Sequence, residues 1–173
     1  MKKGDIWISA ALYFGLGIVV LSLILAAGLP VINKLRDKNI IIQTKEIMFN
    51  LDNIIRAVTR GGAGEQRVVN LDIKKGQFLI NNNYDTINWT TEVNIQVSEI
   101  GIPYRESNVI ISTEKSQVEG EFITTLSLDY SAIADITYTD PTQIVTGQNR
   151  LIIRNNGQTD STPKRINITI FSA

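Results

Sequence analysis

The chain has no cysteine and no histidine among its 173 residues. Without cysteine it can form no disulfide and no thiolate site, and its redox compartment cannot be inferred. Without histidine it can build neither a Ser-His-Asp or Cys-His centre nor a His-ligated zinc site. A small extracellular domain without disulfides depends on its core or on assembly partners. These absences disfavour catalysis, and we expect a protein that is not an enzyme and carries no cofactor.

Other site chemistry is also sparse. The carboxylates are scattered, with no pair at catalytic or metal-ligand spacing. The turn from Asn81 to Asp85 could hold calcium weakly, but a solvated Asn-rich turn is favoured. Aromatic residues are not interleaved with Lys and Arg, so nucleic-acid binding has no support. Residues 61–64, Gly-Gly-Ala-Gly, lack the ending of a phosphate loop and follow a predicted helix, so they indicate a hinge.

Acidic and basic residues balance at 17 each, but they are unevenly placed. Residues 34–60 carry a net charge of +3, and residues from 61 onward carry −4. A basic stem below an acidic head suits a membrane surface or an acidic neighbour. A solvated helix face explains a difference of this size equally well.

The longest feature is an apolar run over residues 6–33. No charged residue lies between Asp5 and Lys34, a gap of 28 positions. A helix needs about 20 apolar residues to cross a bilayer, and only a helix satisfies its own backbone groups in lipid. Trp7 and Tyr13 fit interfacial anchors, with packing between neighbouring helices as the alternative. The run therefore predicts a membrane-spanning helix.

Small residues inside this run are spaced for close helix packing. Ala11 pairs with Gly15, and Ser22 pairs with Ala26, at four-residue spacing. Pro30 removes one backbone hydrogen bond and should bend the helix. Glycine and proline are also common in membrane helices in general.

From residue 34 the helical pattern becomes amphipathic and continues to residue 60. A basic residue and glycines end it at residues 60–62. A continuous helix over residues 6–60 would be about 80 Å long at about 1.5 Å per residue, far longer than one bilayer. The apolar stripe can pack on the chain's own head and leave apolar surface for neighbours. One helical face carries Ile41, Met48, Leu51, Ile55 and Val58, and a second line carries Ile40, Ile47 and Ile54.

From residue 67 the period changes to two, which predicts β-strands. The clearest strand covers residues 87–97, and alternation also predicts strands near residues 69–73, 122–130 and 166–170. Short apolar bursts add expected strands at residues 78–80, 109–111, 133–138 and 151–153. Turn signals lie at residues 75–76, 81–83, 101–103, 140–141, 146–147 and 156–157. The chain is therefore predicted to be α+β, with a long N-terminal helix and an antiparallel β-sandwich or curled sheet as its head.

Two glycosylation sequons begin at Asn88 and Asn167. Both asparagines fall on the polar side of a predicted strand, as an exposed acceptor requires. The composition alone would produce about two such sequons by chance, so they carry no information on location.

The whole layout resembles that of a type IV pilin, most closely the archaeal pilin-like proteins with a class III signal peptide. The short leader Met1-Lys2-Lys3-Gly4, the apolar helix with its amphipathic continuation, and the β-rich head carry this resemblance. Residues 150–157, RLIIRNNG, are also similar to a recurrent ending of archaeal pilin-like heads.

The resemblance implies a leader at 1–4, a membrane and filament-core helix at 5–33, an amphipathic stem at 34–60 and a head at 61–173. It implies that a prepilin peptidase cleaves between Gly4 and Asp5. It also implies that the pilus assembly machinery moves a membrane-anchored precursor from lipid into a helical homo-oligomer, an extracellular cell-surface filament with a role in adhesion. Many bacterial pilins carry a glutamate at the fifth mature position, which here is Ser9. Ser9 removes the cost of burying a carboxylate and also its registering contact, and archaeal filaments often manage without it.

Two alternatives stay open. The chain can be a single-pass anchored extracytoplasmic binding or adhesion domain that never polymerises. It can also be a secreted β-domain whose signal is removed near Gly28, although the apolar run is too long for a typical signal peptide. The mature N-terminus differs among the three cases.

Overall fold

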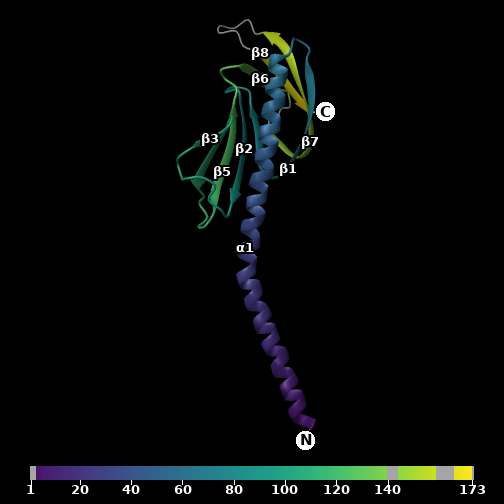
Figure 1. Ribbon diagram of the computed structural model, residues 1–173, viewed down its shortest axis with the longest axis vertical. Helices are drawn as coiled ribbons and strands as arrows, with labels where there is room; N and C mark the ends of the chain where they lie inside the picture. The colour runs from purple at the N-terminus through teal and green to yellow at the C-terminus, as the bar shows by residue number, and fades with distance from the viewer. Residues whose placement is uncertain (1–2, 140–143, 159–165, 173) are drawn as a thin grey trace. The chain divides into compact units, whose positions relative to one another are not determined.

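The computed structural model describes the backbone of residues 3–139, 144–158 and 166–172, and the side chains of residues 7–139, 147–158 and 166–171. The chain divides into two compact units, Met1–Arg36 and Asp37–Ala173. Helix α1 (Lys3–Arg60) contributes to both, and an eight-stranded sheet completes the second unit (Figure 1). The predicted α+β class, a long N-terminal helix followed by a β-rich head, is confirmed.

The first unit contains only the apolar part of α1. Between Asp5 and Lys34 its sequence has no charged residue, so the backbone hydrogen bonds of the helix form with little competition from polar side chains. Pro30 lies inside α1 and removes the N–H that would bond to the carbonyl of Ala26. The helix assignment nevertheless continues through Pro30 to Arg60.

The second unit is built on one mixed sheet with the strand order β3-β4-β5-β2-β1-β7-β8-β6. The sequence left a sandwich and a curled sheet open, and the structure has a single sheet. Its pairs are antiparallel except for β6 with β8, which is parallel. The strands are β1 (Gln66–Asn81), β2 (Thr86–Val93), β3 (Tyr104–Glu106), β4 (Val109–Lys115), β5 (Phe122–Asp129), β6 (Ala134–Tyr138), β7 (Ile144–Gln158) and β8 (Ile166–Ser172).

Residues 37–60 of α1 form the other half of the core. The blue part of the helix lies along the sheet in Figure 1, and its apolar face is buried with the inward side chains of the strands. The predicted second line is only partly buried, at the margin of this contact. Because each fully buried aliphatic side chain contributes about 1.5 to 3 kcal/mol, this face holds the helix to the sheet. All five residues predicted for the inner face are buried: Ile41, Met48, Leu51, Ile55 and Val58.

Three predicted turns are instead irregularities within long strands. The signal at residues 75–76 lies inside β1, where pairing with β7 shifts register between Ile73 and Phe78. Gly76 has a φ of 87°, and a Cβ there would lie 2.5 Å from the carbonyl oxygen of Thr90. The signals at 146–147 and 156–157 both lie inside β7. Glycine supplies the left-handed conformation in each case, but neighbouring strands keep the chain extended. Residues 140–141 lie outside the described residues.

The strand predicted for residues 87–97 ends early, at Val93. Its next residue, Asn94, turns its backbone N–H toward Asp37 on α1, 2.8 Å away, instead of toward a strand. Strand β3 escaped prediction because it has only three residues, all of them exposed. A polar interaction with the helix, which no alternation pattern encodes, therefore ends the clearest strand in the sequence.

The turn between β1 and β2 covers the free edge of strand β6. Asp85 accepts a hydrogen bond from the N–H of Ile136 at 2.8 Å, and Asn82 accepts one from the N–H of Tyr138 at 2.9 Å. Asn82 also donates to the carbonyl of Tyr138 at 3.2 Å. The Asn-rich turn considered for calcium therefore covers a strand edge, which would otherwise be open to pairing with another chain.

Candidate functional site

The first unit exposes nearly all of its apolar surface. Of the 24 large hydrophobic side chains that are exposed among the described residues, 17 lie between Trp7 and Leu35. This helix is long and apolar enough to cross a membrane. A soluble monomer rarely exposes an apolar patch larger than a few hundred Å², and larger patches mark membrane or protein contacts. The helix is therefore a candidate membrane anchor.

The predicted helix-packing residues all lie on this exposed surface. Ala11, Gly15, Ser22, Ala26 and Pro30 are exposed, and a Cβ added at Gly15 would meet no atom within 4 Å. Ser22 donates its hydroxyl proton to the carbonyl of Ile18 at 2.8 Å, so it is satisfied within its own helix. Small side chains with no unmet polar group allow close approach by a second helix or by lipid.

The predicted processing site lies at the beginning of α1. Gly4 and Asp5 are within the first turns of the helix, and their side chains lie outside the described residues. Trp7 and Tyr13 are exposed, at 79% and 75%, as an interfacial or intermolecular contact would need. Cleavage after Gly4 remains a prediction.

In the second unit, Asp37 fastens the helix to the sheet. Its Oδ2 accepts hydrogen bonds from the backbone N–H of Asn94 at 2.8 Å and from the side-chain amide of Asn94 at 2.9 Å. Lys75 in the β1 bulge donates to Oδ1 at 3.2 Å. Burial of Asp37 opposes its ionisation, but the hydrogen bonds from Asn94 and Lys75 and the charge of Lys75 outweigh burial and lower the pKa of the carboxyl below its ordinary value.

We expect the contribution of Asp37 to disappear in acid. The pKa of Asp37 is lower in the folded chain than in the unfolded chain. Its contribution to folding stability is therefore complete above the ordinary pKa of about 3.9. It is lost as the pH falls through the lower folded value. Asp37→Asn should cost about 1 to 3 kcal/mol at neutral pH, and the gap from the wild type should narrow below about pH 4. Denaturant unfolding of the full chain in detergent measures both.

The matched control for this experiment is Asp72→Asn, because Asp72 is exposed and its ion pair with Lys74 is long, at 3.9 Å. Its stability should follow the wild type at every pH. A gap between Asp37→Asn and the wild type that stays constant from neutral pH into acid would refute the role of the Asp37 charge.

A second buried carboxylate, Asp52, joins the helix to two other segments. Arg56 approaches it with Nε at 2.9 and 3.0 Å from the two oxygens. Tyr130, after β5, donates its hydroxyl to Oδ1 at 3.0 Å, and Asn108, before β4, donates to Oδ2 at 2.6 Å. Burial raises the pKa of Tyr130 well above its ordinary value, and the negative charge of Asp52 adds to this effect, so Tyr130 stays a donor.

A further ion pair, from Lys45 to Glu106, connects the helix to β3.

Sequence reasoning did not find either carboxylate. One available signal was spacing: Asp37 lies four residues before buried Ile41, and Asp52 lies four residues after buried Met48. Residues four apart share a helical face, so both carboxylates had to lie on the face that packs on the head. Charge on a buried face indicates a specific partner.

The helix C-terminus is capped from the sheet by Asn155 of β7, which is 1% exposed. Its side-chain amide donates to the carbonyls of Val58 at 2.9 Å and Gly61 at 3.0 Å. The last carbonyls of a helix have no partner within the helix, so a buried end needs such donors. The backbone of Asn155 also binds both Gly64 and Glu65, at 2.8 and 2.9 Å. The predicted hinge at residues 61–64 is therefore a fixed connection.

Replacing Asn155 with alanine should destabilise the second unit by about 1 to 3 kcal/mol, because buried carbonyls lose their donor. Thermal unfolding of the full chain, followed by circular dichroism in detergent, gives the loss. The neighbouring Asn156 is exposed, and its side-chain amide donates hydrogen bonds to Asn167 and Thr169. Asn156→Ala should therefore cost clearly less, and equal losses would contradict the capping role.

Both glycosylation candidates lie on strands, as predicted. Asn88 is half-buried in the central strand β2 and donates to Thr86 at 3.4 Å. Asn167, also half-buried, accepts a hydrogen bond from Asn156 at 3.0 Å. Neither side chain is fully free in this conformation, and their modification remains a prediction.

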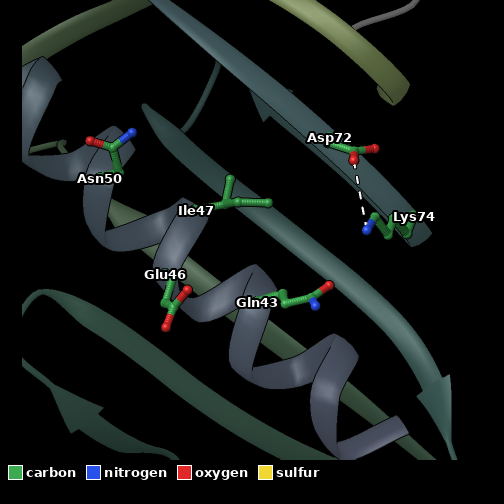
Figure 2. Close-up of a pocket in the computed structure, with 6 residues that line it drawn as sticks. All are labelled: Gln43, Glu46, Ile47, Asn50, Asp72 and Lys74. Atoms are coloured by element: carbon green, nitrogen blue, oxygen red, sulfur yellow. Dashed lines mark ion pairs between the residues drawn. The ribbon is translucent and has the colours of Figure 1, made fainter. Parts of the chain in front are cut away.

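A shallow groove runs between α1 and β1 (Figure 2). Six residues line it: Gln43, Glu46, Ile47 and Asn50 of the helix, and the ion pair of Asp72 and Lys74. No three acidic side chains in the described part of the chain gather to hold a metal ion. The residues that line the groove therefore form ordinary polar surface and do not indicate a metal site.

No family model matches the chain, and neither a curated protein nor a solved structure is found to match it.

Proposed function

We propose that this chain is a structural subunit, a pilin or pilin-like protein, of an archaeal type IV pilus-like surface filament. In the proposed filament the apolar helices bundle in the core and the β-rich heads are exposed, with adhesion as their expected role. The proposal does not involve catalysis, a cofactor or a nucleic acid.

One observation carries this proposal. Exposed apolar surface is concentrated in the first unit, whereas the helix of the second unit buries most of its apolar side chains. Within residues 37–60, only Ile42 remains an exposed large hydrophobic residue, at 44%. The amphipathic stripe therefore packs mainly on the chain's own sheet, and only its margin, with Ile40, Ile47 and Ile54, stays partly exposed. The remaining apolar surface belongs to the segment that suits lipid first and other copies of the helix later.

The head is held to residues 37–60 at several separate places, which supports a mechanical role. Asp37, Asp52 and the Asn155 cap each join the helix to a different part of the head. A subunit whose helix is bound by neighbours would transmit load to its head through these contacts.

The test is to shear surface filaments from the source cells and look for this chain. We expect it to co-sediment with filaments and to be labelled along them by an antibody against the head. Recovery only in the membrane fraction, as a monomer extracted by detergent, would instead support the anchored domain that does not polymerise.

A further inference from the structure

Two threonine hydroxyls in the core of the second unit have no hydrogen-bond partner among the residues that the structure describes. Thr91 of β2 is 4% exposed and Thr124 of β5 is 0% exposed. Within the described part of the chain, neither Oγ1 atom makes a hydrogen bond. Burying a hydroxyl without a partner is unfavourable, and such groups in native proteins are usually satisfied by protein or by internal water.

The two residues lie directly opposite each other, since Thr91 pairs with Thr124 in the β2–β5 register. The adjacent pair on the other face of the sheet, Thr90 and Thr125, forms a direct bond between its hydroxyls at 3.2 Å. The buried pair forms no such bond. Opposite residues in antiparallel strands have Cβ atoms about 4.5 to 5.5 Å apart, and a bridging water spans two oxygens up to about 5.5 Å apart.

A third hydroxyl continues the row. Thr113 of β4 pairs with Thr124 and is also 0% exposed. Its Oγ1 contacts the N–H of Ser98 at 3.1 Å and the hydroxyl of Ser98 at 2.7 Å. The inner face of three neighbouring strands therefore carries a polar row within an otherwise apolar core.

We propose that Thr91 and Thr124 bind one internal water molecule that bridges β2 and β5. Buried waters typically make about three hydrogen bonds, and the two hydroxyls supply two, with Thr113 next in the row. The site lies on β2 just before the strand leaves the sheet to reach Asp37. The water thus satisfies the buried hydroxyls near the end of β2, close to the place where Asn94 bonds to Asp37 of the helix. This proposal is independent of the filament function.

The direct test is a structure of the full chain, in detergent or in filaments, at a resolution that shows ordered water. We expect a water peak within hydrogen-bond distance of both Oγ1 atoms. A direct hydrogen bond between the two hydroxyls, or an apolar side chain packed between them, would overturn the proposal.

Valine variants give a second test that needs no ordered density. Thr91→Val and Thr124→Val should each raise the unfolding equilibrium constant at least about fivefold, because each leaves the bound water and the remaining hydroxyl short of a partner. The double variant should recover much of this loss, since two valines need no water. The outer pair, Thr90→Val and Thr125→Val, is the matched control and should show smaller effects. Additive losses in the buried pair, or single variants more stable than the wild type, would refute the bridge.

Discussion

Replacing Asp52 with alanine should lower the free energy of unfolding by about 2 to 4 kcal/mol. Three side chains, Arg56, Tyr130 and Asn108, direct donors at this carboxylate from 2.6 to 3.0 Å. Alanine leaves a guanidinium partly buried and a phenol fully buried without an acceptor. Removing one member of a buried ion pair costs about 3 to 5 kcal/mol, and the partial exposure of Arg56, 28%, reduces this figure. Since small domains are stable by only about 5 to 15 kcal/mol, the loss would be large.

Denaturant unfolding of the full chain in detergent measures the change. Asp52→Asn keeps one acceptor and similar shape, and should therefore lie between the wild type and Asp52→Ala. Asp72→Asn, which alters an exposed carboxylate, should stay within about 0.5 kcal/mol of the wild type. If Asp52→Ala were as stable as Asp72→Asn, the helix would not depend on this contact.

If the proposed filament function holds, a Leu21→Lys variant should stay in the membrane but yield far fewer filaments. Leu21 lies in the uncharged run and is 57% exposed. A lysine near the centre of a span costs about 2.5 to 3.5 kcal/mol on insertion scales, which the remaining apolar residues can offset. In a bundle, the same lysine would be buried in every copy without a partner, and the cost would recur with each subunit. We expect at least about a tenfold loss of sheared filaments, equivalent to about 1.4 kcal/mol per subunit contact.

The matched control is Leu21→Met, which keeps an apolar side chain of similar volume and should assemble normally. Membrane fractionation and unfolding of the second unit must be unchanged in both variants, so that a loss of filaments reports assembly alone. Normal filaments from Leu21→Lys would show that this part of the helix is not packed in a filament core.

The helix and its buried face could be predicted because their signals are local. The inner-face residues from Ile41 to Val58 repeat at helical spacing, and the 28 uncharged positions mark the apolar segment without reference to any fold. Strands β5 and β8 follow from alternation in the same way, and strands β4 and β6 from short apolar bursts. Periodicity reports which face of an element is buried, and each of these elements buries one face.

The failures come from interactions between residues far apart in the sequence. Asp37 meets Asn94 across 57 positions, and Asp52 meets Tyr130 across 78. These contacts end β2 early and place charge on a buried face. The glycines at 76 and 157 have turn-like dihedrals, yet neighbouring strands convert both turns into bulges. The parallel pairing of β6 with β8 likewise depends on topology. The apolar helix is the part of the candidate site that sequence alone could define, and what it packs against lies outside a single chain.

In the proposed filament, the apolar helix leaves lipid after processing and packs among its own copies. The decisive measurement is mass spectrometry of the N-terminal peptide of the chain recovered from sheared surface filaments. We predict a filament fraction in which the chain begins at Asp5. A chain that still begins at Met1, retains Lys2 and Lys3, and is found only as a monomer in the membrane would contradict the account.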